Sequence, residues 1–331
     1  MGSIEDPKMN ILITGAAGFI GQALTAALIQ KSPLANITLT DVVEPPVPSS
    51  KPSTREQGSV ISLAADLTSK EVCDRLFTND VTHVYLLHGI MSGAAEANYD
   101  LGLQVNVDSM RFIADALRRH TRSNPTKVIF PSSLAVFGPS HPGDVITEAT
   151  MPQPRSSYGA EKAMVELLFN DLSRRGAIDA RIVRLPTIIV RPGKPTGAAS
   201  SFCSGIIREP LNGEVSDLPV RRDLQLWVSS TRTVIRNLVK AKELPSGAFG
   251  NGSRIFNFPG ITVTVDQMLQ ALAEVGGNEA TELVQERPDA GVEKIVGSWP
   301  AVFDVSRARM LGFHDDVSLS QAVRDYIQDY K

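Results

Sequence analysis

Residues 10–21 of the chain read Asn-Ile-Leu-Ile-Thr-Gly-Ala-Ala-Gly-Phe-Ile-Gly. The apolar, β-branched run over 11–14 predicts a short strand, and the spacing of apolar residues over 22–30 predicts a helix. Between them lie three glycines in the pattern Gly-x-x-Gly-x-x-Gly. A strand, a glycine turn and a helix in this order form the phosphate-binding unit of a dinucleotide-binding fold.

Each of the three glycines has its own task in such a unit. Gly15 permits the tight turn, Gly18 lets the backbone approach a pyrophosphate, and Gly21 lets the helix lie close on the strand. The helix start then presents free N–H groups and the positive end of its dipole to the phosphates. An ordinary strand-to-helix turn is the alternative, and an acidic residue at the expected distance decides against it.

Asp41 is that acidic residue, at the end of a strand predicted over 37–40 and 20 residues beyond Gly21. A carboxylate there accepts hydrogen bonds from the 2′- and 3′-hydroxyls of the adenosine ribose and repels a 2′-phosphate, so Asp41 favours NAD over NADP. A strand-end aspartate that starts a turn is the alternative. Arg55 lies too far along a proline-rich loop to indicate NADP.

The rest of the pattern predicts an α/β fold. Further apolar runs predict strands of a parallel sheet that helices cover on both faces. These runs cover residues 60–64, 81–88, 127–131 and 181–191. One helix is expected from Asn106 to about Arg119, and another from Tyr158 to about Arg174.

We therefore expect a Rossmann-type doubly wound parallel sheet with a smaller C-terminal α/β lobe. Residues 1–190 are expected to form the NAD-binding domain, and residues 191–331 mainly the substrate-binding lobe. A segment near 223–260 is expected to return to the main sheet, through a strand at 225–229 and a helix at 231–242.

Composition limits the classes of partner. Among the 331 residues, 33 basic and 36 acidic side chains are dispersed, so no basic run indicates nucleic acid. No apolar run has the length of a membrane span, and residues 1–9 contain no secretion segment. Cys73 and Cys203 lack metal-like spacing, which favours a reducing cytoplasm. The five histidines form no ligand pair, so the sequence predicts no metal site.

Chemistry is expected where a serine pair and a Tyr-x-x-x-Lys pattern come together. Ser132 and Ser133 follow the strand predicted over 127–131, and Tyr158 and Lys162 share one face of the next helix. Tyr-x-x-x-Lys alone is common in proteins. Here it follows the glycine turn by about 140 residues and the serine pair by 25, which makes it specific.

Together these pieces resemble the extended short-chain dehydrogenase/reductase family, in its NAD-dependent epimerase/dehydratase branch. The matching motifs are Thr14-Gly15-x-x-Gly18-x-x-Gly21, Asp41, Asp66-Leu67, Asn106, Ser132-Ser133-x-x-Val-Phe-Gly138, Tyr158-x-x-x-Lys162, Arg184-Leu-Pro and Phe256-Asn-Phe-Pro-Gly260. The stretches 91–98, 184–195 and 199–202 are similar to family members that oxidise sugar acids such as D-erythronate.

The resemblance implies NAD as the cofactor. The expected contacts to it are Gly15, Ala17, Gly18, Phe19, Ile20, Gly21, Asp41, Asp66, Leu67, Leu87, His88, Gly89, Asn106, Ser132, Tyr158, Lys162 and Pro186. For His88, a structural histidine satisfied by its neighbours is an equal alternative. His88 and Gly89 also depart from the family, in which small apolar residues are common at these positions.

The resemblance also assigns the chemistry. A free tyrosine has a pKa of about 10 and is a poor base at neutral pH, so a neighbouring cation is needed. Tyr158 is expected to act as the general base, while Lys162 lowers its pKa and holds the nicotinamide ribose. Ser133 is expected to hydrogen-bond the reacting oxygen.

An acidic substrate requires a counter-charge, for which arginine is well suited. The expected substrate contacts are Ser92, Ser133, Thr187, Arg191, Lys194 and Ser200. For Arg191 and Lys194 a solvated basic turn is the alternative. Thr187 stands where nucleotide-sugar members usually carry an asparagine, which argues against a UDP- or GDP-sugar substrate.

The sequence therefore predicts an NAD-dependent dehydrogenase that oxidises a secondary alcohol of a small polyhydroxy acid. A sugar epimerase or dehydratase, and a ketoreductase of secondary metabolism, are alternatives within the family. A dinucleotide-binding regulator without catalysis is the alternative from another class, and the Tyr158–Lys162 pair argues against it.

The resemblance further implies a homodimer through the helices at 103–119 and 158–174. Candidate interface residues are Phe112, Val165, Leu168 and Phe169, which equally suit the sheet-facing side of these helices.

Overall fold

The computed structural model describes residues 9–331, except 50–57, 121–123, 142, 251 and 317. Arg55 and the first eight residues lie outside the described residues, and so does part of the proline-rich loop after residue 44.

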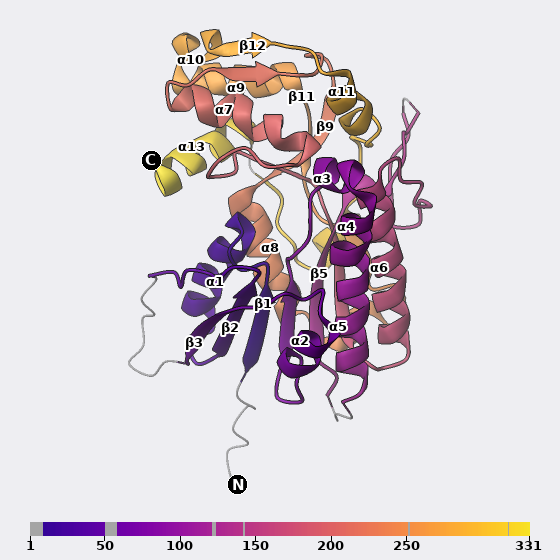
Figure 1. The fold of residues 1–331 in the computed structure, drawn as a ribbon. Helices are drawn as coiled ribbons and strands as arrows, with labels where there is room; N and C mark the ends of the chain where they lie inside the picture. The colour runs from indigo at the N-terminus through magenta and orange to yellow at the C-terminus, as the bar shows by residue number, and fades with distance from the viewer. Residues whose placement is uncertain (1–8, 50–57, 121–123, 142, 251, 317) are drawn as a thin grey trace.

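A seven-stranded parallel sheet forms the larger part of the molecule, in the order β10-β6-β5-β4-β1-β2-β3 (Figure 1). Its strands are β1 (Asn10–Thr14), β2 (Asn36–Asp41), β3 (Val60–Ala64), β4 (His83–Leu86), β5 (Lys127–Ser133), β6 (Asp179–Leu185) and β10 (Ile255–Asn257). The strand order reverses between β1 and β4, which opens a crevice at their carboxyl ends. The prediction of a Rossmann-type doubly wound sheet is confirmed.

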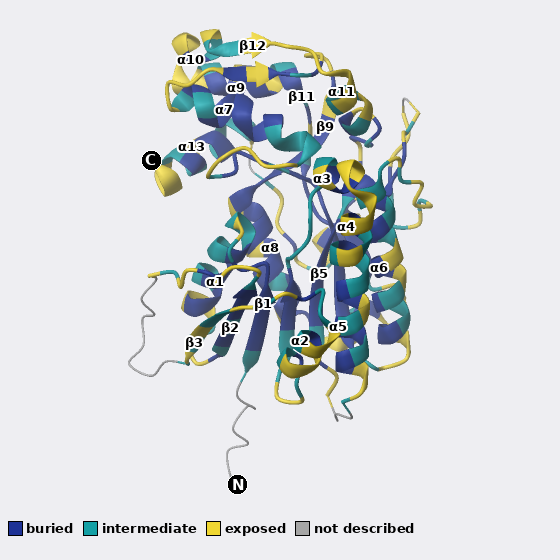
Figure 2. Cartoon of the chain, viewed as in Figure 1, coloured by how far each residue is buried: buried dark blue, intermediate teal, exposed yellow. Residues whose placement is uncertain are grey.

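Helices cover both faces of this sheet (Figure 1). The helices are α1 (Phe19–Lys31) and α8 (Thr231–Glu243) on one face, and α2 (Lys70–Leu76), α5 (Ser109–Arg118) and α6 (Ser157–Arg174) on the other. Side chains alternate between the two faces along a strand. Ile11 and Ile13 of β1 pack in the core beneath α1 and α8, while Leu12 packs in the opposite core. The inner strands are accordingly buried on both sides, whereas the edge strand β3 is partly exposed (Figure 2).

The helix predicted to begin at Asn106 begins earlier, so that boundary was wrong. α3 (Ser92–Ala97) is followed by α4 (Tyr99–Leu103), a π-helical turn at Gln104–Asp108 and α5, without interruption from α4 onward. The Asn98 side chain accepts a hydrogen bond from the Leu101 N–H and caps this long helix. Asn106 therefore lies inside the π-helical turn, whose extra residue no apolar spacing indicates.

Two of the candidate interface residues face the chain's own core. Val165 and Phe169 are buried between α6 and the main sheet. The exposed apolar side chains of α6 are Met164 and Leu167, with 44% and 70% of their surface accessible.

The strand predicted over 181–191 is in fact two strands. Pro186 separates β6 from β7 (Thr187–Ile189), and β7 belongs to a second sheet in the order β11-β9-β7. Proline has no N–H to donate to a sheet, so a break at this position follows from its chemistry. The partners of β7 are β9 (Gln225–Ser230) and β11 (Ile261–Thr264).

The segment expected to return to the main sheet does so only in part. β9 lies at the centre of the second sheet, so its assignment to the main sheet was wrong. α8 packs on the main sheet, where the Tyr85 hydroxyl donates to the Leu238 carbonyl, and β10 pairs with β6. Trp227 of β9 packs against Phe303 with nearly parallel rings.

The smaller lobe has a core of its own. Around it lie α7 (Phe202–Leu211), β8 (Ser216–Leu218), α9 (Val265–Gly276), α10 (Asn278–Glu282), β12 (Val284–Glu286), α11 (Ala290–Val296) and α13 (Leu319–Tyr330), while α12 (Ser306–Met310) lies against β10. The domain boundary at residue 190 stays a prediction. In the part of the chain that the structure describes, no helix is long and apolar enough to cross a membrane.

Candidate active site

Two adjoining pockets lie at the carboxyl ends of the central strands. The glycine pocket, of about 390 Å³, is lined by the turn after β1 and by residues 41–42 and 65–68. The tyrosine pocket, of about 140 Å³, is lined by the end of β5, by Tyr158 and Lys162 of α6, and by residues 185–188. Residues that line both pockets join them into one cleft: Phe19, Ile20, Leu87, His88, Met91 and Arg191.

The turn of the glycine pocket has room only for glycine at two positions. Gly15 has φ +63°, and a Cβ atom there would lie 2.5 Å from the His88 backbone nitrogen. A Cβ on Gly21 would lie 2.5 Å from the Gly15 carbonyl oxygen. α1 starts directly after Gly18 with no side-chain cap and no acidic residue in its first turn. Its free N–H groups therefore suit an anionic ligand.

Acidic residues line the far end of the glycine pocket. Asp41 Oδ2 accepts a hydrogen bond from the Ala17 N–H at 3.1 Å, which ties the glycine turn to the end of β2. Ala17 itself lines neither pocket. Asp66 and Leu67 also line this pocket, and Asp66 Oδ1 accepts hydrogen bonds from the N–H and the hydroxyl of Thr68. This donor and acceptor set fits a dinucleotide, with a carboxylate available to the adenosine ribose.

Asn106 lies behind the wall of the cleft and lines neither pocket. Its amide exchanges hydrogen bonds with the backbone of Ile90, at 2.9 and 3.1 Å, and donates to Glu161 Oε2 at 2.6 Å. A Cβ on Gly89 would lie 2.8 Å from Asn106 Oδ1. Asn106 thus shapes residues 89–90, both of which line the glycine pocket.

Both ring nitrogens of His88 are engaged by the protein. Nδ1 lies 2.7 Å from Thr14 Oγ1, and Nε2 lies 2.9 Å from Ser109 Oγ. Burial lowers the pKa of His88 to about 3, so the ring is neutral at physiological pH. The Ser109 hydroxyl donates to the Val105 carbonyl at 2.6 Å. The Thr14 hydroxyl lies closer to Nδ1 than to the Tyr85 carbonyl oxygen, to which it can also donate at 3.2 Å. We therefore assign the imidazole proton to Nε2, which donates to Ser109, and leave Nδ1 to accept from Thr14.

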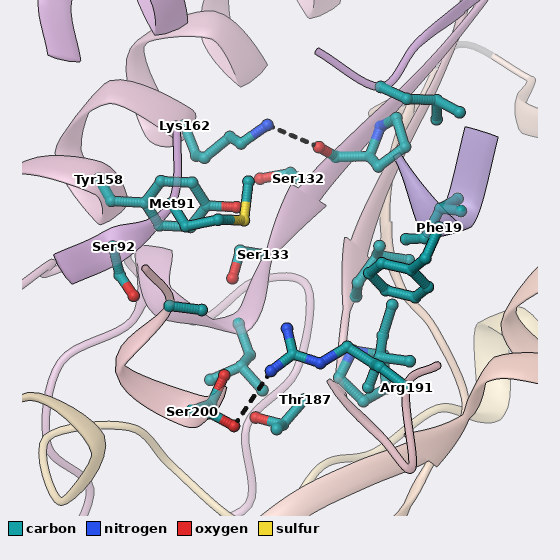
Figure 3. A pocket seen from close by; sticks show the side chains of 18 of the residues that line it. Phe19, Met91, Ser92, Ser132, Ser133, Tyr158, Lys162, Thr187, Arg191 and Ser200 are labelled. Carbon is teal, nitrogen blue, oxygen red and sulfur yellow. Dashed lines mark hydrogen bonds between the residues drawn. The ribbon is translucent and has the colours of Figure 1, made fainter. Parts of the chain in front are cut away.

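Tyr158, Lys162 and Ser133 converge in the tyrosine pocket (Figure 3). Lys162 Nζ donates to the Pro131 carbonyl at 3.0 Å and lies 5.6 Å from the centre of the Tyr158 ring. Burial raises the pKa of Tyr158 to about 12, and its hydrogen bond with Ser133 acts in the opposite direction. Burial lowers the pKa of Lys162 to about 8. The phenol of Tyr158 thus has a cation and a hydroxyl beside it.

A buried ion pair fixes the end of β5 against α6. Arg184 donates from Nε and Nη2 to the two carboxylate oxygens of Glu166, at 2.9 and 2.7 Å. The Ser132 hydroxyl donates to Glu166 Oε1 at 2.5 Å. Ser132 lines the tyrosine pocket, but its hydroxyl proton is directed into the protein. The pair holds Ser133 and Lys162 in register.

Glu161 is a buried carboxylate that no sequence pattern indicated. Only 1% of its surface is accessible, and burial raises its pKa. Oε2 accepts the bond from Asn106, and Oε1 has no hydrogen-bond partner among the described residues. Its charge acts on both neighbours, raising the pKa of Tyr158 and of Lys162.

The expected substrate contacts divide into two groups. Ser92, Ser133, Thr187, Arg191 and Ser200 line the tyrosine pocket. Lys194 is exposed and lines neither pocket. Ser92 is 4% accessible, and its Oγ accepts from the Ala199 N–H at 3.1 Å, so its own proton stays available to a ligand.

Sequence reasoning missed several apolar residues of the tyrosine pocket. Met91, Ile188 and Trp299 line it together with the expected substrate contacts. Trp299 follows Tyr158 by 141 residues and lies between α11 and α12, outside any recognised motif. Only the folded arrangement brings it to the pocket.

Comparison with known proteins agrees with this geometry. Residues 11–245 match the model of the NAD dependent epimerase/dehydratase family. The chain is 41% identical to the D-erythronate dehydrogenase of Cupriavidus necator over 330 residues, which are 97% of this chain and 98% of that protein. It is 40% identical to the D-erythronate dehydrogenase of Haemophilus influenzae over 323 residues, 97% of this chain and 99% of that protein.

Solved structures share the whole fold. A crystal structure described as the nucleoside-diphosphate-sugar epimerase from Agrobacterium tumefaciens matches with a TM-score of 0.89 and 35% identity, over 100% of this chain and 97% of that chain. The holo form of a GalE-like L-threonine dehydrogenase from Cupriavidus necator matches with a TM-score of 0.83 and 25% identity, over 97% of this chain and 100% of that chain. The chain therefore belongs to the NAD-dependent epimerase/dehydratase family of extended short-chain dehydrogenases/reductases, and it is an NAD-dependent oxidoreductase.

Proposed function

We propose that this enzyme oxidises a secondary alcohol of a small polyhydroxy acid such as D-erythronate. The observation that carries the proposal is the Arg191 guanidinium, which lies in the same pocket as Tyr158 and Ser133 and pairs with no carboxylate among the described residues (Figure 3). The 40–41% identity to D-erythronate dehydrogenases supports the same substrate class.

Tyr158 is the proposed general base. Bound NAD supplies the hydride acceptor, so the protein has to remove the proton of the substrate hydroxyl. Tyr158 takes this proton as a phenolate, Lys162 stabilises the phenolate through its positive charge, and Ser133 hydrogen-bonds the reacting oxygen. Lys162 is also the proposed contact to the nicotinamide ribose, since its ammonium lines the pocket beside Tyr158.

Arg191 is the proposed partner of the substrate carboxylate. Only 8% of its surface is accessible, and burial lowers its pKa. A buried cation without an anion is unfavourable, and an anionic ligand that pairs with it removes that penalty. Ser92, Ser200 and Thr187 line the same pocket and offer polar contacts to a polyhydroxy chain.

Net production of NADH tests the proposal. Four- to six-carbon sugar acids are incubated with NAD, with NADP as a control, and absorbance at the NADH band is followed. We expect stoichiometric NADH with at least one acid. No NADH from any acid, combined with interconversion of sugars at constant NAD, would instead identify an epimerase. Binding of NAD without turnover on acids, sugars or ketones would identify a regulator.

An epimerase or dehydratase acting on nucleotide sugars is the second candidate. It is favoured by the 35% identity of this chain to the Agrobacterium structure, which is described as a nucleoside-diphosphate-sugar epimerase. Thr187, in place of the asparagine usual in nucleotide-sugar members, argues against it. A ketoreductase acting on a non-sugar ketone is tested in the same assay by oxidation of NADH.

We further propose a homodimer through the continuous helix of α4 and α5 and through α6. Four apolar side chains of these helices are exposed, with accessible fractions from 41% to 70%: Tyr99, Leu101, Met164 and Leu167. α4 packs directly on α6, so the four residues belong to neighbouring helices. Light scattering at micromolar concentration should give the mass of a dimer, and Leu167→Glu should give a monomer. A monomeric wild type would overturn this proposal.

The cytoplasm is the compartment we propose. Cys73 and Cys203 are buried and unpaired. Burial raises both thiol pKa values to about 12, so neither cysteine forms a reactive thiolate at neutral pH. Fractionation of the source cells checks the compartment.

A further inference from the structure

Ser204, which lines neither pocket, holds Arg191 in place together with the Ser200 carbonyl. Ser204 of α7 is fully buried, and its Oγ accepts hydrogen bonds from the Arg191 backbone N–H at 3.1 Å and from Arg191 Nε at 3.2 Å. The Ser200 carbonyl accepts from Nη2 at 3.3 Å. One edge of the guanidinium is therefore fixed by the protein. No described residue accepts a hydrogen bond from Nη1.

The backbone before Arg191 adopts an unusual conformation. Val190 has φ +52°, the single positive φ of a non-glycine residue in the described part of the chain. A β-branched side chain is strained there, and such strain persists only where the surrounding structure imposes it, often at ligand sites. Val190 is buried in the core of the smaller lobe, while Arg191 extends into the tyrosine pocket (Figure 3).

Arg191 forms no ion pair with any described residue, although other charged side chains lie near it. Arg208 donates from Nη1 to the Arg191 carbonyl at 2.9 Å and forms its ion pair with Glu209. No carboxylate of a described residue forms an ion pair with Arg191. On the cofactor side it meets the Phe19 ring, whose centre is 5.9 Å from Cζ. The free end of the guanidinium thus faces space, not an acidic side chain.

We propose that Ser204 is a positioning residue that makes the enzyme selective for substrates carrying a carboxylate. By holding Nε and the backbone N–H of Arg191, it presents Nη1 and Nη2 to the pocket as a two-pronged donor, the geometry that suits a planar carboxylate. Neutral polyols of the same length lack this contact. The inference rests on the proposed function, in which Arg191 binds the acid group of the substrate.

Binding measurements separate this inference from the proposed function, because they do not depend on turnover. D-erythronate and the neutral four-carbon alditol erythritol are titrated calorimetrically into the protein loaded with NADH. The proteins are the wild type, Ser204→Ala, Arg191→Met and the double variant. Ser216→Ala is the matched control. Ser216 of β8 is also a buried serine and lies beside Gly205 of α7, the helix that carries Ser204, but it does not contact Arg191.

Ser204→Ala should raise the Kd of D-erythronate about tenfold, the effect of one hydrogen bond to a charged group. Arg191→Met should raise it about a hundredfold. In the double variant, removal of Ser204 should add nothing to the effect of Arg191→Met, because Ser204 acts through Arg191. The Kd of NADH should stay unchanged in Ser204→Ala, because Ser204 lines neither pocket, and Ser216→Ala should match the wild type.

Three results would overturn the inference alone: Ser204→Ala binds D-erythronate as tightly as Ser216→Ala does, its effect persists in the Arg191→Met background, or NADH binding weakens in parallel. Failure of the wild type to bind any sugar acid would overturn the proposed function, and the inference with it. Weak erythritol binding that no variant changes would support the role of the carboxylate.

Discussion

Lys162 should lower the free energy of unfolding of the protein, although the proposed chemistry depends on it. Only 6% of the residue's surface is accessible, and burial lowers its pKa from 10.5 to about 8 although Glu161 and Glu166 act in the opposite direction. The free-energy equivalent of one pKa unit is about 1.4 kcal/mol, so keeping the ammonium buried at pH 7 costs about 3 kcal/mol relative to the unfolded chain. Lys162→Met removes this penalty while keeping a long apolar side chain in the site.

The pH dependence of this effect has a definite sign. Between pH 8 and 10.5 the unfolded chain holds a proton on Lys162 that the folded chain has released. The stability of the wild type therefore rises through this window. The advantage of Lys162→Met should be fully present below pH 8 and should vanish as the pH approaches 10.5.

Urea unfolding of the cofactor-free protein measures the difference. At pH 7 the free energy of unfolding of Lys162→Met should exceed that of the wild type by up to about 3 kcal/mol, with turnover abolished. Lys31→Met, at an exposed lysine in the last turn of α1, should change it by less than about 0.5 kcal/mol. A less stable Lys162→Met at pH 7 would refute the reasoning, because the hydrogen bond to Pro131 and the contact with Phe130 would then outweigh desolvation.

Three further predictions test other parts of the site. Tyr158→Phe should lower kcat by about 10²–10⁴-fold and leave the Kd of NAD unchanged, so near-full turnover in steady-state assays would remove Tyr158 as the base. Asp41→Ala should reduce the preference for NAD over NADP, measured as the ratio of kcat/KM values, by about tenfold; an unchanged ratio would contradict the proposed ribose contact. Burial lowers the pKa of His83 to about 4 and that of His88 to about 3, so the unfolded chain binds more protons as the pH falls below 6.5. The urea concentration at the unfolding midpoint should therefore fall as the pH is lowered from 6.5 to 4.5, and it should fall less steeply in His88→Asn. Equal slopes for the variant and the wild type would show that His88 does not contribute.

Local chemistry explains what the sequence predicted correctly. The glycine turn is set mainly by its own residues, because Gly15 has φ +63° and a Cβ on Gly21 would lie 2.5 Å from the Gly15 carbonyl oxygen. Tyr158 and Lys162 are brought together by the helix period alone. The parallel sheet covered by helices follows from apolar runs alternating with helices.

Features that depend on distant packing escaped prediction. A single strand was predicted over 181–191, and only the pairing of β7 with β9 shows that the chain changes sheets after Pro186. The π-helical turn around Asn106 and the positive φ of Val190 are imposed by their surroundings and oppose local preference. Glu161 and Trp299 belong to no motif, so their place beside the chemistry became visible only in three dimensions.

The order in which the main sheet is completed bears on how the protein is made. β10 is synthesised 70 residues after the end of β6, yet it is the strand that pairs along the outer side of β6. Until residue 257 has left the ribosome, one backbone edge of β6 is unpaired. The residues of this strand are all buried in the finished protein. Such an edge invites pairing with another chain. We expect that a gene shortened to residue 245, where the family match ends, yields aggregated protein, although it retains the glycine turn, Tyr158 and Lys162.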